Sequence, residues 1–234
     1  MLDSVNDTQA LCPTLSCSPQ PPTYGKIGKI VETVRCLGPR QFATLLLSML
    51  FSVNHYYILG RNVAAPLKDP LPHKPKEELS PINEDDIAWI KNNINSFERE
   101  DKKEILTRIF FYQSGFKNCY VMRNENGIAY MQWIILPNEN QVITSKYSGR
   151  FLPLRERQVM IENAFTFPSY RGRGYLPFAT QQLMELGKNN GYTSAICYIK
   201  KNNIVSLNEF TKMGFKITKM VTEYKVLGRV RRTL

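Results

Sequence analysis

The fold is decided by a short stretch that reads Pro168-Ser169-Tyr170-Arg171-Gly172-Arg173-Gly174-Tyr175-Leu176. The apolar run Val159–Phe167 predicts a strand before it, and an apolar helix is expected over 175–189 behind it. Glycines let a ligand approach the backbone closely, and the N–H groups at a helix start favour an anion. Arg171 and Arg173 add guanidinium groups suited to phosphate oxygens. The stretch therefore predicts a cradle for pyrophosphate.

A second motif follows one helix later, at Asn203-Ile204-Val205-Ser206, Phe210 and Met213-Gly214-Phe215. The Arg-Gly-x-Gly loop alone is a weak motif, since it is neither a Walker loop nor a dinucleotide fingerprint. The two motifs in this order, with a strand between them, resemble the GNAT superfamily of acyl-coenzyme A-dependent N-acyltransferases. The resemblance extends over about residues 55–230 and is strongest over 159–215.

This resemblance implies a fold and a co-substrate. The fold would be α/β, a mixed α+β arrangement with a splayed, mostly antiparallel sheet flanked by helices, and with an N-terminal helical extension. The co-substrate would be acetyl-CoA or another acyl-CoA, whose pantetheine pairs with the strand at 159–167. The implied coenzyme contacts are Ala164, Phe165, Thr166 and Phe167 on the strand, Arg171, Gly172, Arg173, Gly174 and Tyr175 in the loop, and Asn203, Ser206 and Phe210 one helix later.

The chain departs from the family pattern at two positions. Leu176 stands where glycine or alanine is usual, which would shift the helix start or the coenzyme. Phe210 stands where many members place a tyrosine that protonates the departing thiolate, and phenylalanine cannot donate a proton. Tyr198, Tyr224 or water would then be the acid. Alternatively the thiolate leaves unaided, because the pKa of its conjugate acid is only about 8.5.

A general base is the next requirement, because an amine with a pKa of about 10.4 is almost wholly protonated at pH 7. Glu162 is the acidic residue of the strand at 159–167, and alternation places it on the same face as Met160. We expect Glu162 to be the base; the alternative is that it pairs with a neighbouring arginine or lysine. Asn163 and the hairpin residues Gln132 and Trp133 are expected to contact the acceptor, although Trp133 equally suits core packing.

Composition and charge limit the other function classes. The chain has 234 residues, of which 43% are hydrophobic and 22% charged, as in ordinary globular proteins. Five cysteines and two histidines argue against a disulfide scaffold and a zinc cluster, and favour a reducing compartment. The net charge is +11, and most of it comes from the last third of the chain, which indicates an anion site there. No motif of interleaved basic and aromatic residues suggests nucleic-acid binding.

The N-terminal region differs from the rest in composition. Residues 1–24 predict a disordered tail, rich in proline and polar residues. Residues 25–53 predict a basic amphipathic helical extension, and 54–234 the GNAT-like domain. The apolar run at 42–53 is too short to cross a bilayer, which needs about 20 residues. Two interpretations remain, a helix packed on the domain and a helix lying on an anionic membrane surface.

The remaining elements follow from periodicity and turn residues. A strand is expected at 55–63, a proline-rich connector at 66–75, a helix start at 80–86, a second helix at 101–112, strands at 118–123 and 128–136 joined by the hairpin turn at 124–127, a loop at 137–158, a strand at 194–199, a helix at 203–213, and strands at 215–222 and 225–230.

The function expected from these observations is direct transfer of an acyl group, with acetyl favoured, from coenzyme A to an amine in a ternary complex. The acceptor would be a small molecule, or a lipid or sugar precursor at the inner membrane surface if residues 25–53 bind membrane. The protein would be cytoplasmic, without metal or nucleic acid. The alternative is a catalytically silent module that binds acyl-CoA or a protein partner, as Leu176 and Phe210 would permit.

Overall fold

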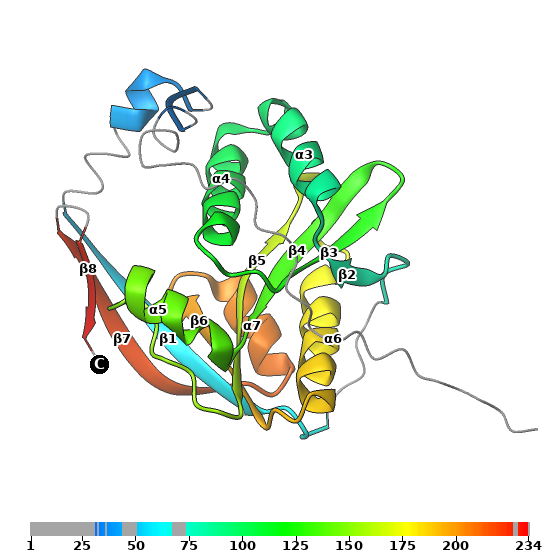
Figure 1. Cartoon of the computed structure of the whole chain (residues 1–234), viewed down its shortest axis with the longest axis vertical. Coiled ribbons are helices and arrows are strands. Elements are labelled where there is room, and N and C mark those ends of the chain that lie inside the picture. The colour runs from blue at the N-terminus through cyan, green and yellow to red at the C-terminus, as the bar shows by residue number, and fades with distance from the viewer. Residues whose placement is uncertain are drawn as a thin grey trace, which may run out of the picture.

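The computed structural model describes residues 31, 33–35, 37–43, 51–66, 74–226 and 229–233. Its strands form a single mixed sheet in the order β2-β3-β4-β5-β6-β1-β7-β8 (Figure 1). The strands are β1 (Phe51–Asn62), β2 (Leu79–Pro81), β3 (Cys119–Asn124), β4 (Gly127–Ile135), β5 (Gln158–Thr166), β6 (Ser194–Lys200), β7 (Lys216–Val226) and β8 (Arg229–Thr233). The helices are α3 (Glu84–Asn93), α4 (Arg99–Gln113), α5 (Asn140–Lys146), α6 (Tyr175–Asn189) and α7 (Ile204–Lys212), with short 3-10 turns η1 (Ile94–Ser96), η2 (Pro137–Glu139) and η3 (Pro168–Tyr170).

The sheet is splayed between β5 and β6. These two strands are parallel and pair only where Gln158–Met160 face Ser194–Ile196, whereas the other paired strands are antiparallel. Beyond this short pairing the strands separate, and the Glu162 carboxylate accepts a hydrogen bond of 2.7 Å from the Tyr198 backbone N–H. The expected splayed, mostly antiparallel sheet flanked by helices is therefore confirmed.

The most N-terminal of the described strands lies in the interior of the sheet. β1 pairs with β6 along Tyr56–Asn62 and with β7 along Phe51–Gly60. Because the ladder to β7 begins at Phe51, residues 51–53 are strand, and the helical extension expected through Val53 is wrong at its end. The alternation of Phe51 and Val53 with polar neighbours suits a strand. The predicted tail at 1–24 and residues 44–50 lie outside the described residues.

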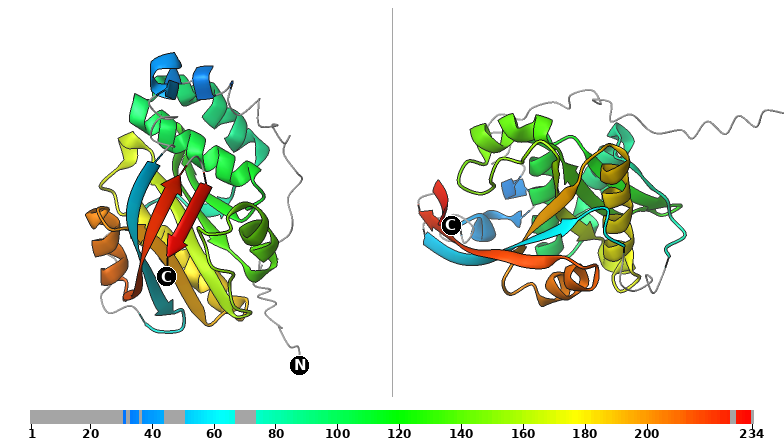
Figure 2. Two further views of the ribbon diagram at one scale, coloured as in Figure 1. Left: turned by 90° about the vertical axis from the view of Figure 1, so that its left-hand side faces the viewer. Right: turned by 90° about the horizontal axis from the view of Figure 1, so that it is seen from below.

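Helices cover both faces of the sheet. α3, α4 and α5 contribute Ile90, Ile105 and Ile143 to a core that also contains Trp133 and Met160. On the other face, residues of α6 and α7 pack on Ile134, Val159 and Ala195. Figure 2 shows α5 and α7 on opposite sides of the part of the sheet formed by β1, β7 and β8. Alternation along β4 and β5 thus separates two cores.

Two local expectations need correction. The helix start predicted over 80–86 begins later, because Ser80 and Pro81 belong to β2, and Asn83 with Asp86 form the capping box of α3. The loop expected at 137–158 contains η2 and α5. α5 has seven residues, of which only Ile143 is buried. Its sequence therefore has no helical period of apolar residues from which the helix could be predicted.

The described part of the N-terminal extension packs on the domain. Residues 33–35, 37 and 39–43 are helical, and Leu37 is buried in the same core as Ile90 and Ile105 of α3 and α4. This supports the packed interpretation for that part of 25–53. Within the ranges that the structure describes, no helix combines the length and apolar character needed to cross a membrane.

Candidate functional site

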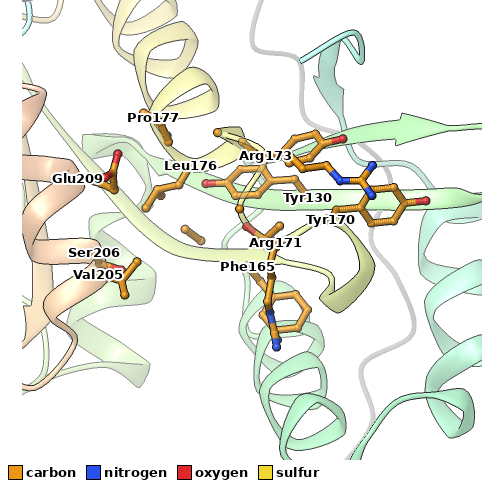
Figure 3. Close-up of a pocket in the computed structure, with 15 residues that line it drawn as sticks. Tyr130, Phe165, Tyr170, Arg171, Arg173, Leu176, Pro177, Val205, Ser206 and Glu209 are labelled. Atoms are coloured by element: carbon orange, nitrogen blue, oxygen red, sulfur yellow. The ribbon is translucent and has the colours of Figure 1, made fainter. Parts of the chain in front are cut away.

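A cavity of about 510 Å³ opens beside the loop at 171–174, and we call it the loop cavity (Figure 3). The end of β5, the loop, the first turn of α6 and one side of α7 form its walls. Of the implied coenzyme contacts, it brings together Ala164, Phe165, Thr166, Arg171, Gly172, Arg173, Gly174, Tyr175 and Ser206. Residues separated by a strand and a helix in the sequence therefore surround one space.

The backbone of the loop is suited to an anion. Gly172 and Gly174 have φ angles of 78° and 76°, in the left-handed region that glycine adopts readily. A Cβ atom at Gly172 would meet nothing within 4 Å, so the backbone there is open to a ligand. Gly174 precedes α6 and supplies no side-chain cap, which leaves the first N–H groups of the helix without such an acceptor. These features fit a diphosphate.

The two arginines of the loop leave it in different directions, as Figure 3 shows. Arg171 forms an ion pair with Asp101 of α4. Arg173 donates to the Ser169 carbonyl at 2.9 Å and lies over the Tyr170 ring. Both guanidinium groups therefore already have partners within the protein. The backbone at Gly172, in contrast, is open to a ligand.

Three implied coenzyme contacts lie elsewhere. Phe167 is 1% exposed and packs against Trp89 and Phe97, so its side chain belongs to the core and not to the loop cavity. Asn203 caps α7, since its side-chain oxygen accepts from the Ser206 backbone N–H at 3.2 Å. Asn203 and Phe210 line a second cavity instead.

This second cavity, of about 300 Å³, lies where β5 and β6 separate, and we call it the splay cavity. Its walls include Glu162 and Asn163 of β5, Tyr198 of β6 and Tyr56 of β1. Ala164 and Ser206 line both cavities, so the two meet at the end of β5. A ligand filling the loop cavity would therefore reach the splay cavity next to Ala164.

Glu162 is held at the wall of the splay cavity by the backbone. One carboxylate oxygen accepts from the Tyr198 N–H at 2.7 Å, and the other accepts from the Asn163 N–H at 3.3 Å. Burial raises the pKa of Glu162 to about 7, although these hydrogen bonds and the charges of Arg232 and Arg108 oppose the rise. None of the ion pairs among the described residues involves Glu162. Such a carboxylate can take a proton near neutral pH.

β5 contains a bulge that the sequence did not predict. Trp133 of β4 faces Glu162 while Met131 faces Phe165, so Asn163 and Ala164 together stand opposite one residue of β4. Asn163 has a φ of 60°, and it is the only described non-glycine residue with a positive φ. The bulge returns Phe165 to the face of the sheet that carries Glu162.

Arg108 of α4, also absent from the sequence predictions, bonds to the bulge. Its guanidinium donates to the Asn163 carbonyl at 3.2 Å and to the Ala164 carbonyl at 2.9 Å. The same group pairs with Glu104 at 2.7 Å. No local motif marks Arg108, because the arginine lies more than 50 residues before the carbonyls that it contacts.

The predicted acids occupy different environments. Tyr198 lines the splay cavity, and its hydroxyl accepts from the Leu152 N–H at 3.1 Å. Tyr224 is 41% exposed on β7 and lines neither cavity, so its position contradicts a role as acid. Tyr56, which was not predicted, lines the splay cavity, and burial raises its pKa. The Arg232 guanidinium lies 4.1 Å from the centre of the Tyr56 ring.

The predicted acceptor contacts also divide. Asn163 lines the splay cavity, as does Gln132, whose amide donates to Thr180 at 3.0 Å and accepts from the Tyr130 hydroxyl at 2.9 Å. Trp133 is 1% exposed, donates to the Phe116 carbonyl and packs edge-on against Phe111. The expected acceptor contact of Trp133 is therefore wrong and the core-packing alternative is confirmed, because strand alternation turns its side chain into the core under α4.

Cys197 does not have the character of a nucleophile. It is buried, and burial raises the pKa of its thiol well above the ordinary value. In the described ranges, no group of three or more His, Cys, Asp or Glu side chains is placed to hold a metal ion.

Comparison with known proteins identifies the fold. No protein-family profile matches the chain, and no curated protein matches its sequence. Solved structures do match. A GNAT-family acetyltransferase from Colwellia psychrerythraea is 12% identical, with a TM-score of 0.50 over 80% of this chain and 61% of that one. This chain has the GNAT fold.

Two further solved structures are similar to this chain. One is the glucosamine N-acetyltransferase region of a fungal multi-domain β-N-acetylglucosaminidase, 15% identical, with a TM-score of 0.51 over 77% of this chain and 22% of that one. The other is a Drosophila protein, 10% identical, with a TM-score of 0.50 over 81% of this chain and 56% of that one. The chain thus spans less than two thirds of each of these three proteins.

The GNAT fold of this chain accommodates both departures from the family pattern. Leu176 packs against apolar residues on the α6 face of the sheet and lines the loop cavity. Phe210 is buried against Phe215, with ring centres 5.0 Å apart, and lines the splay cavity.

Proposed function

We propose that the protein is an N-acyltransferase that moves an acyl group from coenzyme A to an amine. The observation that carries the proposal is the meeting of the two cavities at Ala164, beside a carboxylate whose pKa is about 7. An open cradle for a diphosphate lies on one side of this junction. A proton acceptor lies on the other, and an acyl transfer to an amine needs both.

In this proposal the loop cavity is the coenzyme side. The backbone of Gly172 and Gly174 and the first N–H groups of α6 would hold the diphosphate, and the β5 residues Ala164–Thr166 would lie along the pantetheine. The open space around Gly172 and the absence of a side-chain cap on α6 support this assignment. Bound acyl-CoA would supply an activated thioester.

The splay cavity would be the acceptor side. Glu162 would accept the proton that the amine must lose as its nitrogen bonds to the acyl carbon, and the carbon–sulfur bond would break in the same transfer. Burial raises the pKa of both Tyr56 and Tyr198, so each keeps its proton at neutral pH and can donate it to the departing thiolate. These groups would take over the part that phenylalanine at position 210 cannot play.

The walls of the splay cavity favour a small polar amine. Carboxylate, amide, phenol and guanidinium groups face a space of about 300 Å³, which suits an acceptor with several hydrogen-bonding groups. Glucosamine, the substrate named for the fungal neighbour, is an amine of this kind. A lipid or sugar precursor on an anionic membrane is the extended form of the proposal, resting on the basic residues Lys26, Lys29, Arg35 and Arg40.

A two-stage experiment tests the proposal. Thermal shifts with CoA, acetyl-CoA and longer acyl-CoAs would measure coenzyme binding, and thiol release with a panel of amines would measure transfer. Stabilisation by CoA together with amine-dependent thiol release is the expected result. Stabilisation without thiol release for any amine would indicate the silent binding module that Phe210 permits, and no stabilisation would remove the coenzyme assignment. Sedimentation with anionic vesicles, compared for the full chain and a K26E/K29E/R35E variant, tests the membrane part.

A further inference from the structure

Arg108 connects the helical layer to the junction of the two cavities. The side chain leaves α4, is 9% exposed, and ends in two donated bonds to consecutive carbonyls of the bulge, those of Asn163 and Ala164. It also lies 4.7 Å from the centre of the Phe165 ring, immediately after the bulge. One guanidinium group therefore contacts three consecutive residues of β5.

The bulge needs such a partner for a physical reason. An extra residue interrupts the ladder between β4 and β5, so carbonyls in the bulge lose their regular partners. A buried carbonyl without a hydrogen bond is costly, and a non-glycine residue with a positive φ, here Asn163, adds backbone strain. The planar fork of an arginine can satisfy two neighbouring carbonyls at once, whereas a lysine offers a single point charge.

The position of the bulge makes this support relevant to chemistry. Ala164 lines both cavities, and Glu162 is separated from it by Asn163 alone. A shift of the bulge would therefore move the base relative to the end of the loop cavity. Misplacement of a catalytic group by about 1 Å can cost about 10²-fold in rate.

α4 carries two other contacts on the same side of the helix. Asp101 pairs with Arg171 of the loop. It lies three residues before Glu104 and seven before Arg108. Glu104 lines the splay cavity and is the ion-pair partner of Arg108. Residues at this spacing share one face of a helix, so a single face of α4 touches the loop, the splay cavity and the bulge.

We propose that Arg108 is a positioning residue for acyl transfer, which acts by holding the β5 bulge so that Glu162 faces the end of the loop cavity. The inference rests on the proposed function. Its charge has a second consequence, because Arg108 lowers the pKa of Glu162 against the effect of burial. Loss of Arg108 is thus expected to change both the rate and its pH dependence.

The kinetic test compares Arg108→Met, Arg108→Lys and the control Arg99→Met, an exposed arginine at the start of the same helix. Arg108→Met should lower kcat about 100-fold, change the KM for acyl-CoA by less than about threefold, and raise the pKa of the acid limb of the pH profile. Arg108→Lys should restore much of the pH profile but little of kcat, since it keeps the charge and loses the fork. Arg108→Met with the rate and profile of Arg99→Met would overturn the proposal.

A double-mutant cycle tests the structural part without activity. Asn163→Gly is introduced into the wild type and into Arg108→Met, and the urea midpoint of each variant is measured. If Arg108 holds Asn163 at positive φ, Asn163→Gly will stabilise the protein only while the arginine is present. The change in urea midpoint caused by Asn163→Gly will then differ between the wild type and Arg108→Met. Additive shifts would show that the bulge persists without Arg108 and would overturn the inference. The cycle gives this answer even if the wild type transfers no acyl group, an outcome that would count against the proposed function alone.

Discussion

The two cavities are built in opposite ways. The loop cavity takes most of its wall from residues 164–166 and 170–177, which lie close together in the sequence, and Tyr130 and one side of α7 complete it. The splay cavity combines residues of β1, α4, β4, β5, β6 and α7. The first therefore depends on local backbone geometry, which a motif encodes. The second depends on topology, because strands and helices distant in sequence must be brought together before it exists.

The two cavities also differ in the groups they offer. Backbone N–H groups and glycines dominate the loop, and these are uncharged donors whose strength does not vary with pH. The splay cavity offers titratable side chains, whose pKa values are shifted by burial. Binding in the first should therefore vary little with pH, whereas chemistry in the second should depend on pH.

The largest expected effect separates the two cavities most clearly. Glu162→Gln should lower turnover by about 10²–10⁴-fold, the usual contribution of a general base, while the Kd for CoA stays unchanged. In the wild type, kcat/KM should fall about tenfold from its plateau on going to pH 6, because a base with a pKa of about 7 is then mostly protonated. Steady-state rates and calorimetric titration of CoA measure both. Equal turnover in the variant would remove Glu162 from the mechanism.

The same substitution should change the pH dependence of stability. The pKa of Glu162 is about 7 in the folded protein, against 4.5 as its ordinary value, so the native state holds this proton more tightly. Stability contributed by protonation is thus lost as pH rises from about 4.5 through 7. Glu162→Gln should abolish about 3 kcal/mol of that loss, measured by urea unfolding at pH 5 and pH 8. Parallel curves for the two proteins would contradict the buried, proton-holding state of Glu162.

On the coenzyme side, the double variant Arg171→Ala/Arg173→Ala should weaken CoA binding by about 10–100-fold. The effect is limited because backbone donors remain in place and both arginines are partly engaged within the protein. The matched control is Lys188→Ala/Lys212→Ala, which removes the same charge from exposed positions of α6 and α7. An equal loss of CoA affinity in the two double variants would show that the loop arginines contribute only through the net charge of the protein.

A pair of tyrosine variants tests which tyrosine protonates the departing thiolate. Tyr56→Phe should lower kcat about tenfold, since it removes a protonated hydroxyl at the splay cavity. Tyr224→Phe should leave kcat unchanged, because the ring lies outside both cavities. Thiol release under saturating substrates compares them. A loss in Tyr224→Phe alone would mean that β7 approaches the site during turnover.

The smallest expected effect concerns the ion pair between Asp101 and Arg171. Asp101→Asn should release Arg171 for a bound phosphate and tighten CoA binding by up to about threefold at low salt. The gain should disappear as salt screens the interaction. Weaker binding in this variant would instead mean that Asp101 holds Arg171 in its binding position.

Sequence reasoning succeeded where structure is local. The loop at 171–174, the helix behind it and the hairpin at 124–127 follow from glycines, apolar periods and turn residues close together in the chain. α6 spans Tyr175–Asn189, as predicted over 175–189. These features are determined by neighbours within a few residues, so they can be predicted from the local sequence.

The remaining features depend on contacts that the sequence does not announce. The bulge at Asn163 follows from the fit between β4 and β5 and from Arg108, more than 50 residues away. Tyr56 reaches the site only because β1 lies beside β6. Trp133 lies in the core and not at the acceptor because α4 covers its face of β4, and the sequence of β4 does not specify which helix covers which face. The positions of such residues are determined by pairing between segments that are distant in the sequence.

The central place of β1 has a consequence for how the molecule is made. The strand at 51–62 is bonded to β6 and β7, which end at residues 200 and 226. During synthesis the ribosome releases β1 long before either partner, so its two edges remain unpaired while more than a hundred residues are added. Such distant pairing slows folding. Until β7 has been synthesised, the nascent chain therefore exposes an unpaired strand edge, which favours aggregation.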